Sequence, residues 1–324
     1  MSFRRRAIGC CAAIALAQFV VSESRADPDV WTIASQPRLA ADLAAYRDAE
    51  RFLSASSRAG PDADRRLLLA MAVRSLERVG AADSPDPRPP VMLGRVLSRL
   101  AQYAPAPQGS ELLVRASDVL QRAIAADPDH PVAVDARFAL AVVWARLGQP
   151  RKEIAVYDDL LAREPSRQER VVVLTNRAEA LMVAGDLDES VAGYRAAIWL
   201  AGDQPLAHWG LAIALDRSGD EAGAVASAAN ALRFDPESAA LHDPNVFFLP
   251  AHDRWWYDAL GAMAHAQAEK DRELARSLWA MAASLWSRYL ELASPDDRWV
   301  RTATARRKLC ELKARAPHPQ SRGR

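Results

Sequence analysis

The chain has 324 residues, of which 50% are hydrophobic and 26% are charged, with a formal net charge of +1 and 14 glycines. This composition predicts an ordered chain with a large core and argues against a disordered one. The near balance of charges argues against a general nucleic-acid binder, which needs a strongly basic surface.

The N-terminus has the features of an export signal, which we place at 1–26. Three arginines at 4–6 precede the apolar stretch 7–21, and small residues follow up to a cleavage position after Ala26. The apolar stretch is shorter than the ~20 residues of a membrane span, although an uncleaved anchor remains an alternative. Cleavage leaves 42 − 4 = 38 basic and 41 − 1 = 40 acidic residues, a net charge of −2, with Cys310 as the one cysteine. We therefore expect a mature chain without an intramolecular disulfide, in the periplasm or cell envelope.

Residues 27–133 are expected to form degenerate helix pairs. Apolar residues recur three and four positions apart over 38–56 and 62–80, which is typical of amphipathic helices. The proline-rich stretch 84–90 then interrupts the helical pattern. A Pro-Gly loop at 104–109 is expected before a helix at 110–127.

Residues 134–241 contain a repeat. The stretch "GDEAGAVASAANALRFDP" at 219–236 begins with a Gly-Asp turn and ends in Asp-Pro, and its Ala224 and Ala231 share one helical face. Small residues there allow two helices to approach closely. The same plan recurs 34 residues earlier, where Gly185 starts the turn and Ala197 matches Ala231.

These residues resemble the tetratricopeptide repeat, over 134–238 and less completely over 88–133. The matching positions include Leu140, Ala141, Trp144, Gly148, Tyr157, Ala178, Leu181, Gly185, Tyr194, Ala197, Leu211, Ala212, Leu215, Gly219, Ala224, Ala231 and Pro236. The resemblance implies helix-turn-helix units of about 34 residues. We expect an all-α solenoid of about six such pairs with a C-terminal capping helix.

An irregular apolar segment, 242–252, follows the repeats. Pro244 and Pro250 exclude a helix between them. The aromatic residues in and after this segment are Phe247, Phe248, Trp255, Trp256 and Tyr257. We interpret them mostly as core, and the alternative is a strand that lies in a binding groove. Trp255 and Trp256 cannot both face one core, because adjacent helical residues point about 100° apart.

Two His-Asp pairs, at 242–243 and 252–253, raise the alternative of a metal-dependent hydrolase. Their spacing matches no helix-borne metal motif. Asp253 is predicted instead to cap the helix that follows it, and Asp243 to form a turn before a proline. We expect no metal and no cofactor.

The C-terminal region 253–315 is expected to contain helices at 253–269 and 271–293 and a basic capping helix at 296–315, followed by a disordered tail at 316–324. Cys310 lies among basic residues of the last helix, whose charge could lower the pKa of its thiol, but no histidine is near it in sequence and a cysteine nucleophile is not expected. Such a thiol could cross-link two chains, so a homo-oligomer is possible.

The resemblance implies that the first helix of each pair lines a concave groove that binds an extended peptide or a helix. The groove positions in this sequence are Phe138, Val142, Arg146, Thr175, Glu179, Val183, Trp209, Ile213, Asp216 and Arg217. Asn176 lies where one subclass holds a peptide's C-terminal carboxylate, but the paired lysines of that subclass are absent. Trp209 is the strongest candidate for an interface anchor, and packing within its own hairpin is the alternative.

No phosphate loop, dinucleotide fingerprint or nucleophile elbow occurs in the sequence. The predicted function is a non-enzymatic protein-interaction scaffold of the bacterial envelope. It would bind a segment of a protein partner, with no nucleic acid and no membrane span after signal cleavage. An envelope-assembly or cell-wall factor that uses the same groove is the alternative, and the hydrolase is the alternative from another class.

Overall fold

The computed structural model describes residues 30–243, 246, 248 and 250–315. Regular structure in these residues consists of α-helices and short 3-10 turns without β-strands, which confirms the all-α prediction. None of the described helices is long and apolar enough to cross a membrane. The predicted signal peptide, the predicted C-terminal tail and Phe247 lie outside the described residues.

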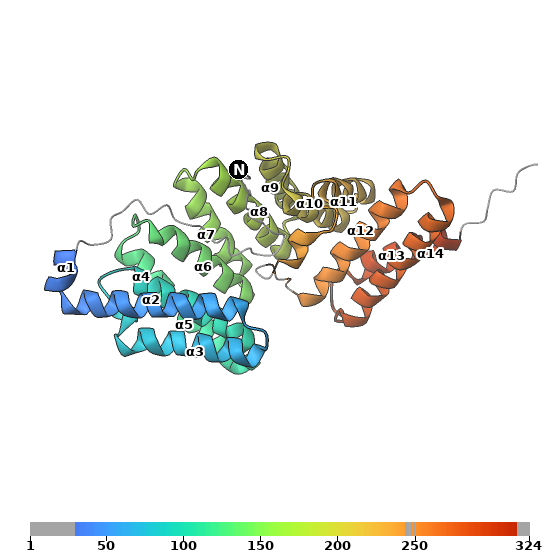
Figure 1. The fold of residues 1–324 in the computed structure, drawn as a ribbon. Coiled ribbons are helices and arrows are strands. Elements are labelled where there is room, and N and C mark those ends of the chain that lie inside the picture. The colour runs from blue at the N-terminus through green and yellow to red at the C-terminus, as the bar shows by residue number, and fades with distance from the viewer. Residues whose placement is uncertain (1–29, 244–245, 247, 249, 316–324) are drawn as a thin grey trace, which may run out of the picture. The chain divides into compact units, whose positions relative to one another are not determined.

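The described chain divides into two compact units, 30–164 and 165–315. The first unit begins with the short helix α1 (Val30–Ser35) and continues as three helical hairpins (Figure 1). They pair α2 (Pro37–Arg58) with α3 (Asp62–Arg78), α4 (Arg88–Leu100) with α5 (Ala106–Ala126), and α6 (Val132–Arg146) with α7 (Pro150–Ala162). The first helices of these pairs lie side by side, since α4 packs against both α2 and α6.

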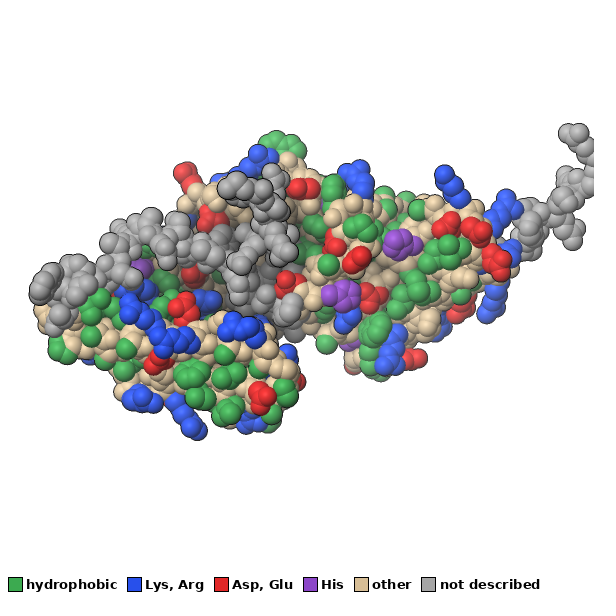
Figure 2. Space-filling view, in the orientation of Figure 1, with side chains coloured by type: hydrophobic (Ala, Val, Ile, Leu, Met, Phe, Trp, Pro, Cys, Tyr) green, Lys and Arg blue, Asp and Glu red, His purple; other side chains and the backbone are tan. Residues whose placement is uncertain are grey.

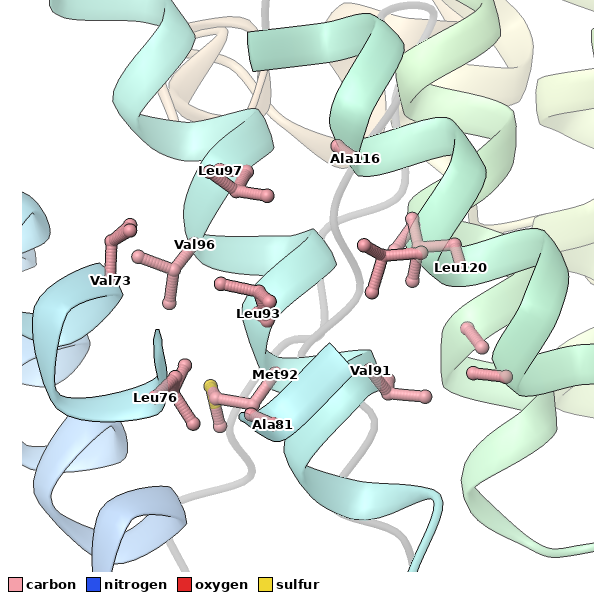
Figure 3. Packing of buried hydrophobic residues seen from close by; sticks show 14 of the residues in the cluster. Val73, Leu76, Ala81, Val91, Met92, Leu93, Val96, Leu97, Ala116 and Leu120 are labelled. Carbon is pink, nitrogen blue, oxygen red and sulfur yellow. The ribbon is translucent and has the colours of Figure 1, made fainter. Parts of the chain in front are cut away.

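The core of the 30–164 unit is centred on one face of α4. Figure 3 shows Met92 and Val96 of α4 beside Leu76 and Val73 of α3, and all four side chains are buried. On the α5 side, a Cβ added at Gly94 would lie 2.5 Å from Cγ of Leu120, so α4 and α5 are in close contact. Burial of each large apolar side chain stabilises the fold by about 1.5–3 kcal/mol, which holds these helices together.

The 165–315 unit contains three further hairpins and a final helix. They pair α8 (Arg167–Ala184) with α9 (Leu187–Leu200), α10 (Pro205–Ser218) with α11 (Glu221–Phe234), and α12 (Arg254–Ala268) with α13 (Arg272–Leu292), and α14 (Val300–Arg315) packs on α13. Two 3-10 turns, η3 (Ala239–His242) and η4 (Ala251–Asp253), lie between α11 and α12. Six pairs and a terminal helix agree with the prediction, whereas the single curved solenoid stays a prediction.

The turns of the repeats form as the sequence predicts. Gly185 and Gly219 end α8 and α10 with φ of 98° and 97°, a left-handed conformation that favours glycine. Asp220 then starts α11 by accepting a hydrogen bond from the backbone N–H of Gly223 at 2.8 Å. The small residues Ala224 and Ala231 are fully buried, which fits close helix contacts.

Two predicted boundaries are wrong. Residues 106–109 are helical, because α5 begins at Ala106 directly after Pro105, and a proline is tolerated in a first helical turn. The last helix begins at Val300, since a turn closed by the Asp297 N–H and the Ser294 carbonyl (2.9 Å) precedes it.

Candidate functional site

The predicted groove residues of α6 do not form an open surface. Phe138 and Val142 are buried. Phe138 packs edge-on against Tyr157 of α7, with ring centroids 6.4 Å apart. Arg146 is half-buried, and its Nη1 donates a hydrogen bond to the Ser98 carbonyl of α4 at 2.8 Å. The prediction that Phe138 and Val142 line a groove is therefore wrong, because these residues fill the contact between helices.

On α8, Thr175 and Asn176 are buried, Glu179 is half-buried and Val183 is exposed. Thr175 is inaccessible and bonds its own helix, through the Val171 carbonyl at 2.8 Å. Glu179 accepts a hydrogen bond from the Tyr194 hydroxyl at 2.6 Å. Burial raises the pKa of Glu179 to about 7, although the Tyr194 hydroxyl and the charge of Arg217 lower it. Glu179 therefore exists near neutral pH as a mixture of acid and carboxylate.

Trp209 is a core residue and does not stand free as an anchor. Its side chain is 1% exposed, and α12 packs against it. A Cβ added at Gly261 of α12 would meet the Trp209 ring at 3.1 Å, and the Tyr257 ring centroid is 6.4 Å from that of Trp209. Ile213, one turn further along α10, is also fully buried. Trp209 therefore has a packing role, as the alternative interpretation proposed. Its contacts with Tyr257 and Gly261 are made to the next hairpin, whereas the alternative placed them within its own hairpin.

Asp216 and Arg217 attach the C-terminal helices to α10. The prediction that these two residues line a groove is therefore wrong. Asp216 accepts hydrogen bonds from Trp256 Nε1 at 2.9 Å and from Arg306 Nε of α14 at 2.6 Å. Arg217 donates to Asp253 Oδ2 at 2.8 Å, and both side chains are buried. Both residues are committed to contacts inside the unit.

Arg217 also lies over two aromatic rings. Its guanidinium carbon is 4.9 Å from the centroid of Trp256 and 5.1 Å from that of Trp299. The charge of Asp253 raises the pKa of Arg217 against the lowering effect of burial. The guanidinium therefore stays charged inside the unit, held by a carboxylate and two indoles.

The aromatic residues in and after the irregular segment differ in burial, and Trp255 and Trp256 do not face the same core, as expected. Trp256 is fully buried against Trp286 and Tyr289, with ring centroids 5.0 Å away in both pairs. Trp255 is half-buried, so the two tryptophans face different surroundings. Phe248 is half-buried against Tyr257 at 5.2 Å, which agrees with a core role for this residue.

The two His-Asp pairs do not converge on a metal site. His252 Nε2 lies 3.2 Å from Asp297, and His242 Nδ1 lies 2.8 Å from the Ser238 carbonyl. Asp253 occupies the capping position of α12 but makes no capping hydrogen bond, because its carboxylate pairs with Arg217. Within the described ranges, no group of three or more His, Cys, Asp or Glu side chains could hold a metal ion.

Cys310 is fully buried in α14. Burial raises the pKa of its thiol to about 12, although Lys313 lowers it. The thiol pKa is therefore not lowered by the basic neighbours of Cys310, because desolvation of the thiolate outweighs their positive charge. Cross-linking of two chains through this thiol would require α14 to detach.

The feature that sequence reasoning missed is a set of buried polar atoms without partners. Both side-chain atoms of Asn176, Oδ1 and Nδ2, lack hydrogen bonds although the residue is 0% exposed. Nε1 of Trp209 on α10, the first helix of the next hairpin, is also unpaired. A buried polar group without a partner costs about 1–3 kcal/mol. Asn176 was singled out by position, but its missing partners could be found only from the packing.

Comparisons with known proteins give limited likenesses. No family model and no curated protein matches the sequence. The solved structure of MamA from Desulfovibrio magneticus RS-1 is 18% identical and covers 58% of this chain and 96% of its own, with a TM-score of 0.44. YrrB, a TPR protein with an unusual peptide-binding site, is 13% identical and covers 73% of this chain and 99% of its own, with a TM-score of 0.41. The helical-hairpin fold is established by the helix pairs themselves.

Proposed function

We propose that this chain is a non-enzymatic scaffold that binds a segment of a partner protein along the first helices of its hairpins. The observation that carries the proposal is Asn176, whose amide is buried with both of its polar atoms unpaired. An amide has one acceptor and one donor group, which matches the N–H and C=O groups of a peptide backbone. A bound segment would supply the missing hydrogen bonds and so recover the free energy that the unpaired groups cost.

Access of a segment to Asn176, which is 0% exposed, requires neighbouring side chains to move while the backbone of the helices stays in place. The helices α8 and α10 are held by buried hairpin contacts, such as Tyr194 against Gly210, where an added Cβ would lie 2.2 Å from the ring. A preformed surface loses little conformational entropy on binding. The predicted signal at 1–26 supports action in the bacterial envelope, where assembly or cell-wall proteins are the expected class of partner.

The test is capture of the partner from the native host. The tagged full chain is cross-linked in intact envelopes, and the proteins attached to it are identified for the wild type, for Asn176→Leu and for Asn230→Leu. Leucine has the branching and the number of side-chain heavy atoms of asparagine but no polar atoms, so the substitution removes the unpaired groups, which offsets the cost of its larger volume in a packed site. Asn230 is exposed on α11 and serves as the matched control.

We expect a partner that is lost with Asn176→Leu and retained with Asn230→Leu. Equal capture by both variants would contradict binding at α8. Absence of any specific cross-linked protein from the wild type would contradict the scaffold function itself.

A further inference from the structure

Two half-buried arginines, Arg95 and Arg99, lie at the edge of the buried face of α4. The core face of α4 carries Met92, Leu93, Val96 and Leu97, as Figure 3 shows for its contacts with α3. Each helical residue is rotated by about 100° from the one before it, so Arg95 and Arg99, which follow Met92 by three and seven positions, project beside Met92 at one edge of this face. Their spacing of four positions places them one above the other on the same face.

A third arginine joins them from α6. Arg146 is anchored by its hydrogen bond to the Ser98 carbonyl at 2.8 Å. Burial and the positive charge of Arg99 together lower the pKa of Arg146 to about 10, although Tyr103 raises it. This effect shows that Arg99 and Arg146 are electrostatic neighbours. We call Arg95, Arg99 and Arg146 the arginine cluster.

The arginine cluster differs from other buried or half-buried arginines of its unit. Arg88 is paired with Asp86 at 2.6 Å, and Arg137 is paired with Asp159. Among the described residues, neither Arg95 nor Arg99 forms an ion pair or a hydrogen bond with a carboxylate. A partly desolvated cation without a counter-charge is unfavourable, and an incoming anion would relieve it.

The surroundings of the arginine cluster come from α2 and from the turn after α4. Burial and the charge of Glu50 raise the pKa of Tyr46 on α2, whereas Arg95 lowers it, so these three groups lie near one another. Tyr103, in the 3-10 turn η2 (Ala101–Tyr103), raises the pKa of Arg146. The cluster thus lies on α4 and α6, and its surroundings include Tyr46, Tyr103, the exposed Glu50 and the half-buried Asp135.

We propose that the arginine cluster binds an acidic segment of the partner protein, with carboxylates that pair with Arg95 and Arg99. The inference rests on the proposed scaffold function and names the chemistry of its partner. Guanidinium groups bind carboxylates through two parallel hydrogen bonds, a geometry that lysine cannot provide.

The spacing of the arginines selects an extended segment. Residues four apart on a helix are separated by about 6 Å along its axis. Side chains on the same side of an extended peptide recur every two residues, at about 6.6 Å. Acidic residues at alternate positions of an extended segment therefore match the two arginines of α4, and Arg146 on the neighbouring helix adds a third positive charge.

The test uses the full chain and a fluorescein-labelled peptide of sequence Glu-Ser-Glu-Ser-Glu-Ser, titrated by fluorescence anisotropy at low salt. The variant is Arg95→Gln with Arg99→Gln. The matched control is Arg74→Gln with Arg78→Gln, because these arginines are also four apart but are exposed on α3. We expect saturable binding by the wild type and by the control, a loss of at least about tenfold in the variant, and weakening by added salt.

Several results would overturn the inference. They are the absence of saturable binding, an equal loss of affinity in both double variants, equal binding of a Lys-Ser-Lys-Ser-Lys-Ser peptide, or complete displacement of the acidic peptide by millimolar inorganic phosphate. Circular dichroism verifies the fold of each variant, and Arg99→Gln alone replaces the double variant if that one is misfolded. The titration needs no natural partner, so its failure would leave the capture experiment at Asn176 standing as the test of the scaffold function.

Discussion

The buried ion pair between Arg217 and Asp253 provides a quantitative test of how the 165–315 unit is held together. Replacement of Arg217 by methionine keeps much of the side-chain volume but removes the charge. The Asp253 carboxylate, which lies 2.8 Å from Arg217 and is buried, then loses its counter-ion. Its second oxygen, Oδ1, already has no hydrogen-bond partner, so no other group can compensate.

The expected destabilisation follows from these contacts. Removal of one partner of a buried pair costs about 3–5 kcal/mol. Loss of the guanidinium above Trp256 and Trp299, at 4.9 and 5.1 Å, adds about 0.5–2 kcal/mol. The total is a large part of the roughly 5–15 kcal/mol that stabilises a typical domain. Replacement of both partners, Arg217→Met with Asp253→Leu, should restore most of the loss, because no uncompensated charge remains.

Urea denaturation, followed by tryptophan fluorescence and circular dichroism, measures the free energies of unfolding of the wild type, both single variants and the double variant. Arg51→Met breaks an exposed pair with Asp48 and should change stability by less than about 1 kcal/mol. The reasoning would be refuted if Arg217→Met had an effect as small as that control. It would also be refuted if the double variant were destabilised by the sum of the single effects.

Three further predictions concern other buried groups. Gly210→Ala should destabilise the fold by about 1–3 kcal/mol, because the added Cβ would lie 2.2 Å from the Tyr194 ring. Gly60→Ala, where the added Cβ has no atom within 4 Å, should have little effect. The midpoints of urea denaturation compare the two variants. Cys310 should resist alkylation at pH 8 in the native chain and react in urea, because the residue is buried and burial raises its pKa to about 12. Mass spectrometry of the peptide that contains Cys310 measures the alkylation. Rapid labelling of the native chain would contradict the burial. Glu179 has a pKa raised by burial to about 7, so it contributes stability that is complete below about pH 4.5 and is lost as the pH rises through 7, by at most about 3 kcal/mol. Glu179→Gln should remove this part of the pH dependence of unfolding, and an unchanged pH profile would disprove the assignment.

The local parts of the fold could be predicted from the sequence because their causes are local. The Gly185 and Gly219 turns require a left-handed conformation that glycine adopts without strain, and the periodic alanines allow close contact of neighbouring helices. The start of α5 was missed because Pro105 and Gly109 suggest a loop when taken alone. In the structure, a Cβ at Gly109 would lie 3.0 Å from the Ala101 carbonyl, so this glycine serves a close approach within a helix.

The candidate site was predicted poorly because it depends on contacts between distant segments. The repeat pattern correctly places Trp209 on a first helix, but only the folded chain shows that Gly261 packs on its ring. Asp253 was assigned to helix capping from its neighbours in sequence, whereas Arg217, 36 residues earlier, takes its carboxylate. The export signal predicted at 1–26 lies outside the described residues and stays a prediction.

The contacts made by the last helix and the turn before it also determine how the 165–315 unit folds. Arg298 Nη2 bonds the Val183 carbonyl, 115 residues away in sequence, and Arg306 bonds Asp216, 90 residues away. In a simple repeat array each unit contacts only its neighbours, and folding can spread from any of them. Contacts of such high contact order are slow to form, because a long loop must close first. During translation, therefore, this unit reaches its final state only after Arg306 has left the ribosome, and until then the charged end of α10 remains without its partner from α14.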